Sequence, residues 1–131
     1  MSSIFTKIIN GEIPCYKIAE DDKFFAFLDI NPLKKGHTLV IPRKEIDYLF
    51  DLEEGLLAEM MVFSRNIALA IEKVVPCNRI GVVVLGLEVP HAHIHLIPID
   101  SEADVRFSNP RVKMTEQEFE DLAAQIRKEL Q

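Results

Sequence analysis

The chain has 131 residues, of which 48% are hydrophobic and 27% are charged, and its formal net charge is −6 at pH 7. This length fits one domain with one hydrophobic core, so we expect a single domain over residues 1–131. The acidic balance, with no run of more than two basic residues, argues against a nucleic-acid partner. No apolar stretch is long enough to span a membrane and no signal-peptide pattern is present, which predicts a cytoplasmic protein without a membrane partner.

Two cysteines, Cys15 and Cys77, lie far apart in the sequence and form no CxxC pair. This usage is typical of reduced thiols in a reducing compartment rather than of a disulfide framework. We therefore expect both cysteines to be structural.

Short elements alternate along the amino-terminal half of the chain. Apolar residues at helical spacing before Asn10-Gly11 predict a short helix over residues 4–9. Two strand-like runs, 16–19 and 24–30, flank a polar turn and predict a hairpin. After a loop containing Pro and Gly, the segment 37–42 (HTLVIP) predicts a third strand.

The second half of the chain is expected to contain one long helix, further strands and a terminal helix. Asp51 and Glu54 suggest a capping box, after which apolar residues recur every three to four positions until Pro76. The apolar run 79–85 predicts a central strand or one buried on both faces. Thr115 and Glu118 suggest another capping box before an amphipathic helix over about 116–130. The fold class is therefore α+β: an antiparallel sheet of about five strands, one long helix and short terminal helices, with the helices on one face.

A cluster of histidines is the most informative stretch of the sequence. Only four histidines occur, and three of them fall within HAHIHLIPI, residues 91–99. Side chains alternate between the two faces of a strand, so we expect His91, His93 and His95 to share one face and the apolar residues between them to pack inward.

Three interpretations of this histidine face are open from the residues alone. It could be a solvated polar face, although a strand needing only polarity normally uses Thr, Lys or Glu. It could hold a metal ion, with a third ligand from His37, Asp29 or Glu88, but no residue near these has metal-ligand spacing. Alternatively, one imidazole is a nucleophile that attacks an electrophile such as phosphorus, while its neighbours donate hydrogen bonds to the developing charge.

The sequence resembles the histidine triad (HIT) family, in particular its nucleotide-binding branch. Residues 91–97 fit the motif His-φ-His-φ-His-φ-φ, where φ is apolar, at all seven positions. Three earlier blocks are similar to the family's successive segments in the same order: IFTKIINGEIP (4–14), EDDKFFAFLDINP (20–32) and GHTLVIPRK (36–44). The resemblance therefore extends over about residues 4–99.

This resemblance implies a hydrolase or transferase of nucleotidyl compounds, nucleoside phosphoramidates among them, that works through a covalent nucleotidyl-histidine. It implies that His93 is the nucleophile, held by the carbonyl of His91, that His95 contacts phosphate, and that His91 and His37 complete the polar network. Asp29 would accept hydrogen bonds from the ribose hydroxyls. The remaining implied contacts with the nucleotide are an apolar slot for the base, made by Phe5, Ile8, Ile13, Phe27 and Ile30, and the loop residues Gly86, Glu88 and Val89.

The loop before the triad departs from the family pattern. Leu87 stands where the family usually carries a Gln, and no Asn occupies the stretch just before it. An apolar side chain cannot donate to a phosphate oxygen, and losing one such donor typically slows a reaction by about two to three orders of magnitude. Glu88 is either an acid that acts on the substrate or a solvent-facing loop residue.

A second departure concerns metal. Some bacterial members of the family look zinc-bound through an amino-terminal CxxC, a His after the IPRK-like block and the first triad His. Here these positions are Ser3, Thr6, Glu45 and His91. We therefore expect no structural zinc, no metal in the site and no cofactor.

Two functions from different classes fit these observations. The first is a nucleotidyl hydrolase that uses His93; the second is a module that binds a nucleoside monophosphate, a purine one by resemblance, with little turnover because its loop is altered. The resemblance also implies a homodimer that pairs the long helix and the apolar strand 79–85 across a two-fold axis. The polar stretch 101–114, with Arg106, Arg111 and Lys113, is either a surface loop or a segment that closes over phosphates, and we expect a surface loop.

Overall fold

The predicted elements follow one another in the expected order along the chain. A computed structural model describes residues 2–130. Its elements are α1 (Ile4–Ile9), β1 (Lys17–Glu20), β2 (Phe24–Leu28), β3 (Thr38–Pro42), the 3₁₀ helix η1 (Leu49–Asp51), α2 (Glu54–Val74), β4 (Arg79–Val83), β5 (Ile94–Ile99), the 3₁₀ helix η2 (Glu102–Val105) and α3 (Glu116–Lys128). The α+β class is confirmed. None of the helices in the described range is long and apolar enough to cross a membrane.

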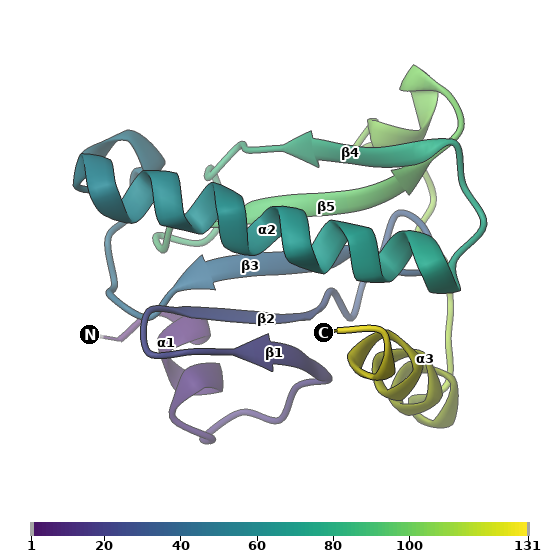
Figure 1. Ribbon diagram of the computed structural model, residues 1–131, viewed down its shortest axis with the longest axis horizontal. Helices are drawn as coiled ribbons and strands as arrows, with labels where there is room; N and C mark the ends of the chain where they lie inside the picture. The colour runs from purple at the N-terminus through teal and green to yellow at the C-terminus, as the bar shows by residue number, and fades with distance from the viewer. Residues whose placement is uncertain (1, 131) are drawn as a thin grey trace.

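The five strands form one antiparallel sheet in the order β1-β2-β3-β5-β4 (Figure 1). The pairing of β3 with β5 joins segments that are more than fifty residues apart and places Leu39 opposite His95. His37 precedes β3 and is diagonal to His95 across this pair, within reach of a long side chain. The register therefore brings the isolated fourth histidine to the triad.

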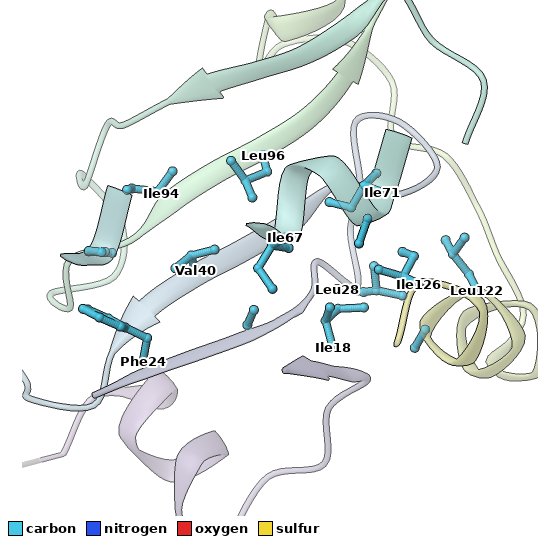
Figure 2. Packing of buried hydrophobic residues seen from close by; sticks show 14 of the residues in the cluster. Ile18, Phe24, Leu28, Val40, Ile67, Ile71, Ile94, Leu96, Leu122 and Ile126 are labelled. Atoms are coloured by element: carbon cyan, nitrogen blue, oxygen red, sulfur yellow. The ribbon is translucent and has the colours of Figure 1, made fainter. Parts of the chain in front are cut away.

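One face of the sheet packs against α2 and α3 (Figure 2). The strands contribute Ile18, Phe24, Leu28, Val40, Ile94 and Leu96 to this core, and all six are nearly inaccessible to solvent. Ile94 and Leu96 are the apolar residues that alternate with the histidines, together with Ala92. The prediction that this side of the histidine segment packs inward is confirmed.

The opposite face is covered as well, so the prediction that all helices lie on one face was wrong. Phe25 and Phe27 of β2 and Leu39 and Ile41 of β3 form a second cluster with Phe5 of α1. Strands β2 and β3 are buried at every position and thus have no face that could be left in water. The short helix α1 covers this second apolar face and comes to lie beside the histidines.

The two predicted capping boxes had different outcomes. At α3, the Thr115 hydroxyl accepts from the Glu118 amide at 3.1 Å and the Glu118 carboxylate accepts from the Thr115 amide at 2.9 Å, which confirms that box. At α2 the box is absent, because Asp51 ends a 3₁₀ turn and the helix begins only at Glu54, after an N-cap Glu53 without a side-chain hydrogen bond. Leu49 and Leu52 are both buried, and their packing explains why the chain turns before the helix starts.

Two strands differ from expectation. β4 is an edge strand with partly exposed side chains, so the prediction of a central or doubly buried strand was wrong: Val82 is 51% exposed. β5 begins only at Ile94, so His91 and His93 precede the strand rather than lie in it. The Ala92 amide instead donates to the Ile46 carbonyl at 2.7 Å, which ties the triad segment to the loop after β3.

Candidate active site

The ring of His93 is fixed by a contact with the backbone two residues earlier. Its Nδ1 atom lies 2.7 Å from the carbonyl oxygen of His91. A carbonyl oxygen can only accept, so Nδ1 carries the proton and Nε2 holds a free lone pair in the neutral ring. The structure therefore presents one imidazole nitrogen in the form that attacks electrophiles.

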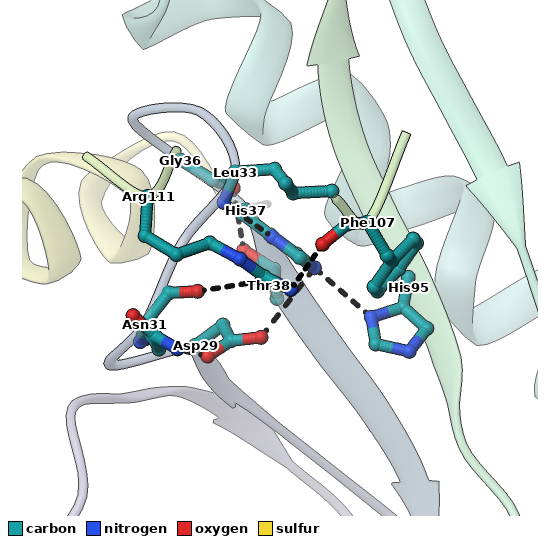
Figure 3. Close-up of polar contacts among 9 residues, drawn as sticks. All are labelled: Asp29, Asn31, Leu33, Gly36, His37, Thr38, His95, Phe107 and Arg111. Atoms are coloured by element: carbon teal, nitrogen blue, oxygen red, sulfur yellow. Dashed lines mark hydrogen bonds and ion pairs between the residues drawn. The ribbon is translucent and has the colours of Figure 1, made fainter. Parts of the chain in front are cut away.

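A second hydrogen-bonded chain fixes His37 and His95 (Figure 3). The Leu33 amide donates to Nδ1 of His37 at 3.0 Å, so the proton of His37 is on Nε2. That Nε2 lies 2.9 Å from Nδ1 of His95, which must accept. The proton of neutral His95 is consequently on its own Nε2, where it can be donated to a ligand.

His91 is held from both ends of its ring. Nε2 lies 2.7 Å from the carbonyl oxygen of Pro42, and Nδ1 lies 2.7 Å from the hydroxyl of Ser3. Because the carbonyl requires a proton on Nε2, Nδ1 of the neutral ring accepts from the Ser3 hydroxyl. The ring of His91 is thus fixed in one orientation.

The amino-terminal end of this network rests on Glu45. Its carboxylate accepts from the Ser3 amide and from the Thr6 hydroxyl, both at 2.6 Å, and the hydrogen bond from Ser3 is the main cause of a lowered pKa of Glu45. The four residues at the positions compared with zinc ligands, namely Ser3, Thr6, Glu45 and His91, are joined here by hydrogen bonds.

Burial keeps the supporting histidines neutral. It lowers the pKa of His37 to about 3 and the pKa of His95 to about 4, and in both cases loss of solvent is the largest cause and neighbouring positive charge adds to it. Burial also lowers the pKa of His91. At neutral pH these three rings act as neutral hydrogen-bonding groups with fixed tautomers.

The free side of the triad opens into a cavity of about 360 Å³. His93 and His95 form part of its wall, and the residues before the triad form a loop at its edge. The lining residues are Phe5, Asp29, Asn31, Leu39, Leu85, Gly86, Leu87, Glu88, Val89, His93, His95, Phe107 and Arg111. This volume suits a small-molecule ligand.

The cavity contains seven of the thirteen site residues that the sequence suggested. Six others lie elsewhere: His37 and His91 hold the triad from behind, while Ile8 and Phe27 belong to the cluster that packs behind Phe5. Ile13 is half-buried outside the cavity, and Ile30 is 71% exposed and lines a different hollow beside α3. The structure therefore brings Phe5 to the cavity but not the other four residues suggested for the base slot.

Asp29 lies at the floor of the cavity next to His37. Its carboxylate accepts from the Asn31 amide at 2.8 Å, and its other oxygen is 3.6 Å from Nε2 of His37. Burial raises the pKa of this carboxyl, although the Asn31 hydrogen bond and the positive charge of Arg111 work in the other direction. Asp29 keeps acceptor capacity for a ligand hydroxyl.

The segment expected to be a surface loop contributes two side chains to the site. The ring of Phe107 lies edge-on to His95, with 4.9 Å between the ring centroids, and the guanidinium carbon of Arg111 lies 5.4 Å from the centroid of the Phe107 ring. The segment is tied down by the Val112 amide, which donates to the Pro32 carbonyl at 2.9 Å. The sequence feature that could have indicated this contribution is Phe107, a single large aromatic residue within a polar stretch.

One group within residues 2–130 has the composition of a metal site, consisting of Asp29, His37 and His95. The hydrogen bonds oppose this use. Nε2 of His37 carries a proton because the Leu33 amide occupies Nδ1, and that proton is already directed at Nδ1 of His95. Metal binding needs unprotonated nitrogens, so the arrangement suits a hydrogen-bond chain better than an ion.

Comparison with known proteins agrees with this geometry. The family model of the HIT domain matches residues 10–102. An uncharacterized HIT-like protein of Borreliella burgdorferi is 34% identical over 131 residues, covering 94% of each chain. The adenosine 5′-monophosphoramidase hnt1 of Schizosaccharomyces pombe is 38% identical over 104 residues, covering 78% of this chain and 77% of its own.

Solved structures give the same result for the fold. The crystal structure of a HIT-like protein from Bartonella henselae matches with a TM-score of 0.84 at 33% identity, covering 98% of this chain and 96% of that one. The family model, the relatives and the solved structure therefore agree. The chain belongs to the histidine triad family.

Proposed function

We propose that this protein hydrolyses or transfers nucleotidyl groups, with nucleoside phosphoramidates and related compounds as substrates and His93 as the nucleophile. The observation that carries this proposal is the 2.7 Å contact between Nδ1 of His93 and the His91 carbonyl, which leaves Nε2 unprotonated. His93 also lines the cavity.

The reaction has two displacements at phosphorus. In the first, the lone pair on Nε2 of His93 forms a bond to phosphorus, and the bond from phosphorus to the leaving group breaks with its electron pair going to that group. An amine leaving group takes up a proton from solvent as it departs, and the water that attacks in the next step returns a proton to solvent. In the second, water attacks the same phosphorus, the phosphorus–nitrogen bond breaks, and the nucleoside monophosphate leaves as His93 is regenerated.

The neighbours of His93 supply binding and charge stabilisation. The Nε2 proton of His95 can be donated to a phosphoryl oxygen, and the fixed tautomer means that no rearrangement is needed to present it. Asp29 accepts from the ribose hydroxyls. Phe5 lies 5.0 Å from His93 between ring centroids and provides an apolar surface for the base, while Gly86, Glu88 and Val89 also line the cavity.

The relatives support this choice of substrate. Adenosine 5′-monophosphoramidase is the name of a relative with 38% identity. A purine nucleoside monophosphate or its amidate is therefore the first ligand to test.

A second candidate function is a nucleotide-binding module with little turnover. The observation that favours it is Leu87, which lines the cavity edge and is 89% exposed. This side chain provides no donor for a phosphate oxygen or a leaving group. In such a module, the same histidines hold a monophosphate without releasing a product.

A homodimer is part of the proposal. β4 is an unpaired edge in the chain, and Val82, Val84 and Leu85 along it and just after it are 40% to 51% exposed. An apolar edge of this kind is normally covered. Analytical ultracentrifugation of the native chain and of Val82→Lys tests this: a dimer that becomes a monomer in the variant supports it, and a native monomer contradicts it.

The test of the activity is a product assay with adenosine 5′-phosphoramidate. We expect the native protein to form AMP and His93→Ala to lose about a thousandfold or more of that rate. The control is Lys73→Ala, a change near the end of α2, which should form AMP at the native rate after the same purification. If the native protein binds AMP but forms no product, the proposal that it hydrolyses this substrate is wrong, and the binding module is the remaining candidate.

A further inference from the structure

Arg111 is a cation in the wall of the cavity that the proposed mechanism does not use. It comes from the segment between η2 and α3, and its guanidinium donates to the carbonyl of Asn31 at 2.9 Å and to that of Phe107 at 3.1 Å. Figure 3 shows these two contacts, with the guanidinium beside Asp29 and His37. The segment thereby brings a positive charge to Asn31, which is 80 residues earlier in the sequence, and to the neighbouring His37.

The charge of Arg111 is not neutralised by an ion pair. None of the ion pairs formed among residues 2–130 includes Arg111. The two backbone hydrogen bonds use two of its five N–H donors. A partly buried guanidinium with free donors in a cavity is well suited to bind phosphate or sulfate, which its planar fork can contact twice.

A series of ring contacts connects Arg111 to the nucleophile. His93 and His95 lie 5.0 Å apart between ring centroids, Phe107 lies 4.9 Å beyond His95, and the guanidinium carbon of Arg111 lies 5.4 Å from the centroid of Phe107. No hydrogen bond, ion pair or cation–π contact among residues 2–130 joins Arg111 directly to His93 or His95. This position fits a second anionic group of the ligand better than the phosphoryl group that His93 attacks.

Two carboxylates also line the cavity and limit where such an anion can lie. Glu88 belongs to the loop before the triad, and Asp29 is engaged by the Asn31 amide. An anion close to either ionised carboxylate is repelled. Because the guanidinium lies beside Asp29 (Figure 3), the part of the wall that favours negative charge is the side of Arg111 that faces away from this carboxylate.

We propose that Arg111 determines specificity by binding a second phosphate or sulfate of the substrate, in addition to the one that His93 attacks. This inference rests on the proposed function, because it assumes a nucleotidyl ligand on the triad. The second anion belongs either to the leaving group or to a phosphate on the ribose, since Arg111 lies beside Asp29 and beside His37, whose ring contacts His95 (Figure 3). The preferred substrate is then a nucleotide with at least two anionic groups.

The test is calorimetric titration of the full chain with three ligands that share adenosine. AMP carries one phosphate, ADP carries a second on the 5′ side, and adenosine 3′,5′-bisphosphate carries a second on the ribose. Chromatography after each titration verifies that the ligand is intact. The proteins are the native chain, Arg111→Gln, Arg111→Lys and the control Arg106→Gln, which alters an exposed arginine of the same segment.

We expect the native chain to bind one of the two-anion ligands at least about tenfold more tightly than AMP. Arg111→Gln should abolish this advantage, Arg111→Lys should retain part of it, and Arg106→Gln should retain all of it. Whether ADP or the bisphosphate shows the advantage identifies the side on which the second anion lies.

Four results would overturn the inference. The native chain could bind AMP with no gain for either two-anion ligand, which would leave the proposed function intact. The gain could persist in Arg111→Gln, or that variant could weaken all three ligands equally, which would indicate that Arg111 only ties down its segment. If the native chain bound none of the ligands, the nucleotide-binding proposal itself would fail with it.

Discussion

The carbonyl oxygen of His91 accepts a hydrogen bond from Nδ1 of His93 at 2.7 Å, a contact between residues two positions apart. It is possible because β5 begins at Ile94, and the first pair of its ladder with β3 joins Val40 to Ile94. The His91 carbonyl therefore lies outside the sheet ladder and is free to hold the ring. The departure from regular strand geometry is what sets the tautomer of the proposed nucleophile.

The Ser3 hydroxyl should prove important for stability although it lies outside the cavity. Ser3→Ala removes the donor to Nδ1 of buried His91 and the acceptor for the Thr6 amide. An unsatisfied buried nitrogen costs about 1–3 kcal/mol, and the lost helix cap adds to this. Urea unfolding measures the loss, with Ser2→Ala, at an exposed position, as the control. Equal stability of the two variants would show that Ser3 does not support His91.

Stability should fall as the pH drops from 7 to 5. His37 and His95 stay neutral in the folded protein because their pKa values are about 3 and about 4, whereas in the unfolded chain they gain protons below about 6.5. The unfolded state then binds more protons, so each ring removes up to about 1.4 kcal/mol per pH unit between 6.5 and its folded pKa. The raised pKa of Asp29 has the opposite effect, because it favours the folded state as the pH falls, but it involves only one proton.

The measurement is urea unfolding at pH 7, 6 and 5. His95→Asn is the informative variant, because its side-chain oxygen can still accept from His37 while one titrating ring is removed. We expect a shallower pH dependence for it than for the native chain. A stability that stays constant between pH 7 and pH 5 would mean that the histidines are not held neutral.

Gly36 should not tolerate a side chain. Its φ is +96°, and a Cβ there would lie 3.0 Å from Val75 Cγ2 and 3.2 Å from Pro98 Cγ. Backbone strain and overpacking together predict a loss of about 2 kcal/mol or more for Gly36→Ala, and His37 would shift with it. Gly11→Ala is the matched control, since Gly11 has φ +79° but nothing within 4 Å of a Cβ. Thermal unfolding that ranks Gly36→Ala no lower than Gly11→Ala would contradict this view.

The sequence predicted those parts of the fold that local signals determine. The box of Thr115 and Glu118, the short helix before Asn10 and the apolar residues between the histidines all depend on neighbours a few positions away. The contact of the His93 ring with the His91 carbonyl, which the resemblance to the triad motif implied, is present as well.

The features that the sequence did not predict depend on long-range packing. The edge position of β4 follows from strand order, which an apolar run such as 79–85 cannot reveal. The placement of α1 on the second face depends on Phe25 and Phe27 both needing cover on that side. Phe107 and Arg111 are held at the site by a contact between residues far apart in sequence, in which the Val112 amide donates to the Pro32 carbonyl.

The central claim is that Nε2 of His93 forms a bond to phosphorus. Its most direct test is rapid-quench mass spectrometry of the native chain mixed with adenosine 5′-phosphoramidate, with fragmentation to locate the added mass. We predict one adenylyl group per chain, on His93, that forms before steady-state AMP release and is absent in His93→Ala. An adenylyl group on another side chain, or AMP formation at the native rate by His93→Ala, would contradict the account.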